Sequence, residues 1–134
     1  MMDYFSSADL QPPASEADLA QLEEKLGFRL PDDYRAFLLV ADGYDGDVRV
    51  KGYARLWPSR QVASDNDGYQ VRSYVPDLAL IGSNAGPTAY GIDRHDGQPW
   101  FVSIPFMPMQ RNEIRRLGAT FTEFLAALSN GEGW

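Results

Sequence analysis

The sequence predicts an α+β fold: a mainly antiparallel twisted sheet with two N-terminal helices and one C-terminal helix packed on it. Apolar residues recur at helical spacing near both ends of the chain, and short β-rich runs between turn residues fill the middle. The length of 134 residues suits one domain. We expect residues 1–14, which end in two prolines, to be a flexible lead-in and residues 15–134 to form that domain.

Two helices come first. Ser15 and Asp18 approximate a capping box, and the helix that they open is expected to end at Gly27. Pro31 is a favoured first-turn residue and opens the second helix, which Gly43 ends. The predicted buried faces consist of Leu19, Leu22, Leu26, Tyr34, Phe37, Leu38 and Ala41.

Short strands and turns fill the middle of the chain. Asp45-Gly46-Asp47 reads as a turn, Ser64 to Gly68 as a loop, and Gly82 to Gly86 as a turn between strands. Asp93 to Gly97 has the Asp-Gly chemistry of a hairpin. The expected strands are residues 48–50, 53–57, 78–81, 88–92 and 100–104.

A last helix closes the chain. Pro105 and Pro108 cannot donate to a strand ladder, so the region Met107-Pro108-Met109 is expected to leave the sheet. Thr120 and Glu123 form a second capping box, and Asn130-Gly131 is the predicted stop. The expected buried face is Phe121, Phe124, Leu125 and Leu128.

The formal charge of −7 is distributed unevenly. Residues 1–50 contain eleven acidic and four basic side chains, whereas residues 51–134 contain eight of each. Such a field repels nucleic acid and anionic membranes and favours a basic protein partner. The chain has no cysteine and no apolar run long enough to cross a bilayer. We therefore expect a cytoplasmic protein, a monomer or weak dimer, that binds neither nucleic acid nor membrane.

Few residues favour chemistry. Counted from Asp42, the third and twelfth positions of a calcium loop are Tyr44 and Tyr53, so the ligand spacing is wrong. His95 is the only histidine, and its place in a hairpin favours exposure over a catalytic role. The turn from Gly82 lacks the phosphate-binding patterns. We expect no catalytic residue, metal or cofactor.

Arginines and tyrosines are the remaining candidates for binding. Arg111, Arg115 and Arg116 read as a solvated turn, because the net charge opposes extended phosphate contact. Tyrosines in polar stretches are common interface anchors. The expected partner-binding residues are Asp42, Tyr44, Asp45, Asp47, Asp65, Asp67 and Tyr69.

The order of landmarks along the chain from Ser15 resembles the SUKH superfamily, the Smi/Knr cell-wall regulator type. The motifs are short, but they follow one another at plausible separations. Asp42-Gly43 stands where the family usually has Asn-Gly. The residues that carry the resemblance are Leu22-Glu23, Leu26-Gly27, Leu30 to Leu38, Asp42-Gly43, Leu56-Trp57-Pro58, Ile81 to Gly86, Tyr90 to Asp93, Pro99 to Pro105 and Thr120 to Leu125.

The resemblance implies a single SUKH-like domain over residues 15–134 and a non-enzymatic role in protein binding. Many such bacterial proteins are immunity proteins that neutralise a cognate toxin, often a nuclease, and an acidic surface suits that task. Two alternatives stay open: a regulatory scaffold that recruits a cellular partner, and a small carboxylate-dependent hydrolase that uses His95 with Asp93 and Asp96.

Overall fold

The first helix, α1 (Glu16–Leu26), begins at a complete capping box. In the computed structural model, which describes residues 1–133, Ser15 Oγ accepts a hydrogen bond from Asp18 N at 3.1 Å, and the Asp18 carboxylate accepts one from Ser15 N at 3.0 Å. Gly27 ends the helix with a φ of 83°, a left-handed conformation that suits glycine. The second helix, α2 (Asp32–Val40), follows Pro31. Both predicted N-terminal helices are confirmed.

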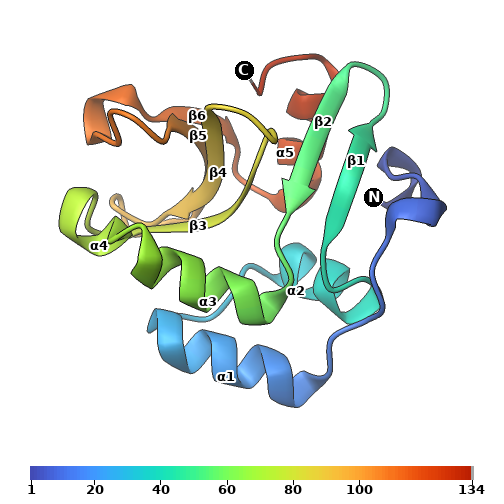
Figure 1. Ribbon diagram of the computed structural model, residues 1–134, viewed down its shortest axis with the longest axis horizontal. Helices are drawn as coiled ribbons and strands as arrows, with labels where there is room; N and C mark the ends of the chain where they lie inside the picture. The colour runs from blue at the N-terminus through green and yellow to red at the C-terminus, as the bar shows by residue number, and fades with distance from the viewer. Residues whose placement is uncertain (134) are drawn as a thin grey trace.

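Six antiparallel strands within residues 1–133 form one curled sheet, and each strand pairs with the next along the chain (Figure 1). The predicted fold class is therefore confirmed. The strands are β1 (Tyr44–Val48), β2 (Gly52–Leu56), β3 (Leu78–Ser83), β4 (Thr88–Asp93), β5 (Trp100–Pro105) and β6 (Arg115–Gly118).

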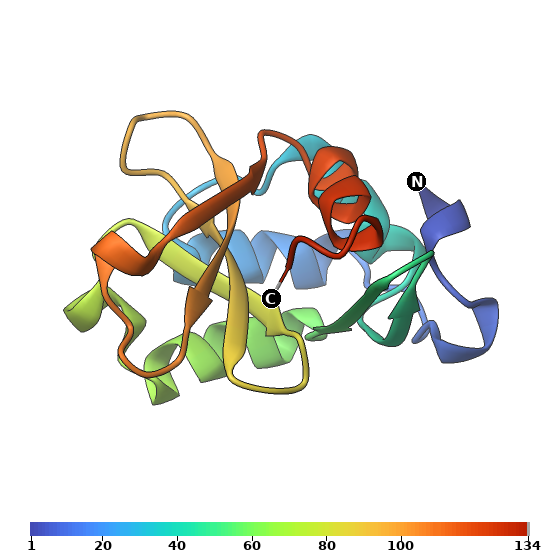
Figure 2. The same cartoon turned by 90° about the horizontal axis from the view of Figure 1, so that it is seen from above.

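Helices cover the sheet in two groups. In Figure 1, α1 lies beside α3 (Ser59–Gly68), which packs on β3 and leads into the short helix α4 (Val71–Tyr74). The C-terminal helix α5 (Phe121–Ser129) packs against β6, β2 and α2, and Figure 2 shows it next to α2 from above. Three short 3₁₀ turns complete the described structure: Met2–Tyr4, Ser7–Asp9 and Arg111–Glu113.

The loop predicted from Ser64 to Gly68 is wrong, because these residues form the second half of α3. Local composition favours a loop, but tertiary contacts determine the outcome. The Asp42 carboxylate accepts hydrogen bonds from Ser59 N at 2.6 Å and Ser59 Oγ at 3.1 Å, and so caps the start of the helix from outside it. Val62 is fully buried on the inner face.

The predicted turn Asp45-Gly46-Asp47 is also wrong, because these residues are the middle of β1. Their side chains alternate as in a half-buried strand, with both aspartates exposed and Gly46 buried. A Cβ at Gly46 would lie 2.7 Å from Asp9 Oδ2, so the Asp9 side chain approaches the strand closely at this glycine. The strand predicted at residues 48–50 correspondingly ends at Val48.

Strand β6 is not predicted from the sequence, and the expectation that its arginines form a solvated turn is wrong. Arg115 and Arg116 instead belong to this edge strand, which pairs with β5. The Arg116 guanidinium lies 4.4 Å from the ring centroid of Trp100 and pairs with the Asp96 carboxylate. A four-residue polar strand has too little apolar alternation to be recognised locally.

Residues 1–14 lie along the outer edge of β1. Phe5 is buried, and isolated β-bridges join Phe5 to Val48 and Leu10 to Tyr44. The segment therefore covers an edge that would otherwise expose unpaired backbone groups. The division of the chain into a flexible lead-in, residues 1–14, and a domain that begins at Ser15 stays a prediction.

The side chain of Asp33 links helix α2 to helix α5. The Asp33 carboxylate, in the first turn of α2, accepts hydrogen bonds from Phe121 N at 3.1 Å and from Thr122 N at 2.9 Å, both in the first turn of α5. Thr120 Oγ1 caps the same helix by accepting from Glu123 N at 3.1 Å. Glu123 Oε1 accepts from Ala119 N rather than from Thr120 N, so the predicted second capping box is only half formed.

A buried amide joins α3 to the sheet. Asn66 Nδ2 donates to Val62 O at 2.7 Å and to Leu80 O at 2.8 Å, and Asn66 Oδ1 accepts from Leu80 N at 2.8 Å. The side chain thus satisfies backbone groups of β3 that no neighbouring strand reaches.

We expect Asp33→Ala to lower the free energy of unfolding by about 1–2 kcal/mol, because helix α5 loses an acceptor for two amide groups. Asp32→Ala is the matched control, since Asp32 occupies the same helical turn, is exposed, and makes only a 3.7 Å pair with Arg29. The decrease in the free energy of unfolding caused by Asp32→Ala should stay below about 0.5 kcal/mol. Urea unfolding measures both values, and equal losses would contradict the capping role.

We expect Asn66→Asp to cost about 3 kcal/mol, because the substitution removes two donated hydrogen bonds and buries a carboxylate against carbonyl oxygens. Asn112→Asp makes the same chemical change at an exposed position of the Arg111–Glu113 turn and should be nearly neutral. Thermal unfolding at constant pH would test the difference. A melting temperature for Asn66→Asp equal to that of the control would refute the linking role.

Candidate functional site

Tyr44, expected to be a partner-binding anchor, is a buried structural residue. Only 1% of it is exposed, and its ring lies 4.6 Å from that of Phe5 between centroids. The hydroxyl accepts a hydrogen bond from Ser6 N at 3.0 Å and donates to the Asp47 carbonyl. Tyr44 therefore holds the N-terminal segment on β1, and a partner cannot reach the ring.

Three carboxylates surround the Tyr44 hydroxyl, and we call them the β1 acidic patch: Asp9, Asp45 and Asp47. Burial raises the pKa of Tyr44, and the negative charges of these three aspartates raise it further. Asp45 and Asp47 are exposed neighbours on the outer side of β1. The structure thus gathers two of the predicted binding residues with Asp9, which the sequence did not single out.

The members of the β1 acidic patch differ in how far they are engaged. Asp45 accepts hydrogen bonds from Tyr53 Oη at 2.6 Å and from Arg55 Nε at 3.1 Å. The Asp9 and Asp47 carboxylates make no hydrogen bond or ion pair with any residue in 1–133. They are the carboxylates that a cationic partner could pair with at no loss of internal contacts.

A groove of about 520 Å³ adjoins the β1 acidic patch where the N-terminal segment, β1 and the start of α3 meet. Asp42 and Asp45 contribute acidic groups to its wall, and Arg55 and Arg60 contribute basic ones. Asp42 is half-buried and engaged in capping α3, so its first role is structural. The groove therefore brings together three of the predicted residues, namely Asp42, Tyr44 and Asp45.

The other predicted residues lie along and beyond the second half of α3. Asp65 accepts a hydrogen bond from Gln61 Nε2 at 3.0 Å, whereas the Asp67 carboxylate has no such partner within the described chain. Tyr69 is 46% exposed and stacks at 6.3 Å on Trp57. Asp65, Asp67 and Tyr69 do not line the groove beside β1.

Phe106 extends this aromatic surface and was missed by sequence reasoning. Its ring lies 5.1 Å from that of Tyr69, and the next residue, Met107, is highly exposed. The signal that could have found it is a pair of large apolar residues between Pro105 and Pro108, where the chain is expected to leave the sheet. We call Trp57, Tyr69 and Phe106 the aromatic platform.

The hydrolase alternative has little geometric support. His95 is exposed, and its Nδ1 lies 3.5 Å from Asp77 Oδ2. Asp93 is held by Arg111 at 3.0 Å and Asp96 pairs with Arg116, so both carboxylates are engaged by arginines. Residues 1–133 contain no group of three or more side chains placed to hold a metal ion, and no helix among them is long and apolar enough to span a membrane.

Comparison with known proteins gives a match to a family model, whereas no curated protein matches the chain. The model of the SMI1/KNR4 family (SUKH-1) matches residues 13–127, which include both N-terminal helices, all six strands and most of α5. Because this match covers most of the chain, the resemblance seen in the sequence is confirmed, and the chain belongs to the SMI1/KNR4 (SUKH-1) family.

Proposed function

We propose that this protein is a non-enzymatic immunity protein that neutralises a basic bacterial toxin domain by binding it stoichiometrically. SUKH proteins are commonly immunity proteins of polymorphic toxin systems, which supports the general role. The observation that carries the proposal for this chain is the β1 acidic patch, in which Asp9 and Asp47 are free to meet cations on a partner.

Charge and apolar contact have different tasks in this proposal. Unpaired carboxylates raise the rate at which a basic partner arrives, and this effect weakens as salt screens it. In the aromatic platform Trp57 is buried and supports the exposed ring of Tyr69, which with the partly exposed Phe106 offers large, rigid side chains of the kind that dominate binding energy once the surfaces meet. Asp65 and Asp67, four and two residues before Tyr69, add negative charge near the platform.

The remaining parts of the proposal concern setting and assembly. We place the activity in the cytoplasm, since a chain without cysteine needs no oxidising compartment to fold. The protein is proposed to act as a monomer or weak dimer, so one copy would occupy one toxin domain. A nuclease is a suitable toxin class, because carboxylates can lie where a nuclease binds phosphates.

Co-expression with the product of the adjacent gene tests the function directly. We expect that product to arrest growth when expressed alone and growth to be restored when this protein is expressed with it. The two should then co-purify in a 1:1 ratio. A non-toxic neighbour, or toxicity that persists beside normal amounts of this protein, would refute the immunity proposal.

We expect Asp47→Lys to slow association with that toxin about tenfold at low salt, because the reversed charge repels a basic surface. Glu113→Lys changes the net charge equally on an exposed residue outside the groove, the β1 acidic patch and the aromatic platform, and should leave the rate within about twofold. Stopped-flow measurements at two salt concentrations would compare them. Equal slowing by both variants would contradict a role for the β1 acidic patch.

A further inference from the structure

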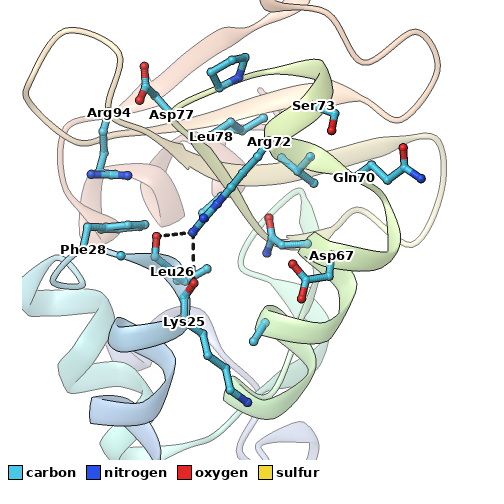
Figure 3. A pocket seen from close by; sticks show the side chains of 16 residues that line it. Lys25, Leu26, Phe28, Asp67, Gln70, Arg72, Ser73, Asp77, Leu78 and Arg94 are labelled. Carbon is cyan, nitrogen blue, oxygen red and sulfur yellow. Dashed lines mark hydrogen bonds between the residues drawn. The ribbon is translucent and has the colours of Figure 1, made fainter.

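A second pocket, of about 610 Å³, lies where the C-terminal end of α1 meets α4 and the start of β3 (Figure 3). In Figure 1 this region, marked by α4, lies at one end of the molecule, and β1 with the N-terminus lies toward the other. The pocket therefore lies away from the β1 acidic patch, and it contains none of the three aromatic platform residues, although Asp67 lines it as well. We call it the α4 pocket.

Arg94 is the least satisfied charged group of the α4 pocket. Its guanidinium lies 3.8 Å from the ring centroid of Phe28, and the residue is half-buried. Its Nε is buried and unpartnered, and its terminal nitrogens have no acceptor within residues 1–133. A guanidinium that is partly desolvated without an acceptor is costly, and an oxyanion at its open edge would offset that cost.

Arg72 brings a second guanidinium to the same space. Its Nη2 donates to Leu26 O at 2.6 Å and to Lys25 O at 3.1 Å, the last carbonyls of α1. Figure 3 shows the side chain extending across the pocket toward Leu26 and Phe28. These bonds fix the guanidinium in place, and its other nitrogens have no acceptor among residues 1–133.

The backbone around the α4 pocket is unusual in the same region. Gln70 and Asp77 adopt left-handed conformations, with φ of 54° and 73°, and both line the pocket. Residues other than glycine rarely adopt positive φ angles, and such backbone conformations recur at binding sites. The turn at Gln70 connects α3 to α4, the helix that carries Arg72.

The rest of the pocket wall is mixed. Leu26, Val71 and Leu78 line the pocket but are buried, so the apolar wall open to a ligand consists of Phe28, Ala63 and Pro76, which are partly or fully exposed. Asp67 and Asp77 also line the pocket, but Figure 3 shows the Asp77 carboxylate directed away from Phe28. Its Oδ2 lies 3.5 Å from His95 Nδ1. An apolar wall beside two guanidinium groups suits a ligand with an apolar body and an anionic head.

We propose that the α4 pocket binds a small ligand whose aromatic or aliphatic body lies on the apolar wall and whose oxyanion, a carboxylate or a phosphate monoester, meets Arg94 and Arg72. Arginine is suited to both head groups, because its planar fork offers paired donors to two oxygens of one acid. This site goes beyond the proposed toxin binding and does not depend on it.

Nuclear magnetic resonance titration of the full chain with phenyl phosphate, benzoate and neutral benzyl alcohol tests the site. We expect saturable amide shifts at residues 26–28, 70–73 and 94 with at least one of the two acids, and little response to the alcohol. Shifts with one acid alone identify the head group, and shifts with both support the shared oxyanion chemistry. No saturable shift with either acid, or equal binding of the alcohol, would overturn the proposal.

Two substitutions and a control sharpen the test. We expect Arg94→Gln to weaken binding of the effective acid about tenfold, and Arg94→Lys, which keeps the charge but loses the fork, to fall between this variant and the parent protein. Arg115→Gln removes an exposed charge on β6, outside the pocket, and should bind as the parent does. Arg94→Lys remains available if Arg94→Gln fails to fold. Unchanged affinity in a folded Arg94 variant would exclude Arg94 as the anion ligand.

Discussion

The packing around Phe121 is the contact on which the rest of the molecule depends. Its ring lies 5.1 Å from Phe37 of α2, 5.6 Å from Phe101 of β5 and 5.3 Å from Tyr34, measured between centroids. These rings are fully buried and belong to elements at the start, the middle and the end of the chain. This cluster, together with the hydrogen bonds from Asp33, joins α2 to α5 and to strand β5 of the sheet.

The acidic N-terminal third is not a uniform surface. Several of its carboxylates are used inside the fold: Asp18 caps α1, Asp33 caps α5 and Asp42 caps α3. Helix N-termini favour negative charge, so these positions explain part of the acidity without any partner. The carboxylates left for the proposed partner binding are the smaller, unengaged set, above all Asp9 and Asp47.

Sequence reasoning succeeded where local pattern and tertiary structure agree. The helix from Ser15 and the hairpin around Asp93 to Gly97 carry their own caps and turn residues, and both are present. It failed where contacts with residues distant in the sequence determine the local secondary structure. Residues 64–68 are helical because Asp42 and Leu80 satisfy polar groups of α3 from afar. For the candidate site, it found the aspartates of β1 but not the burial of Tyr44 or the half-buried guanidinium of Arg94.

The strip of residues along the edge of β1 has a consequence for how this surface can change. Asp9 belongs to a segment, residues 1–12, that lies before the family match, whereas Asp45 and Asp47 lie within it. A substitution at Asp9, whose carboxylate makes no hydrogen bond or ion pair within residues 1–133, can alter one border of the surface while the helices and strands of the matched domain keep their contacts. In the proposed role, partner preference can thus change at Asp9 without loss of folding contacts, whereas Asp45 is bound to Tyr53 and Arg55 within the sheet.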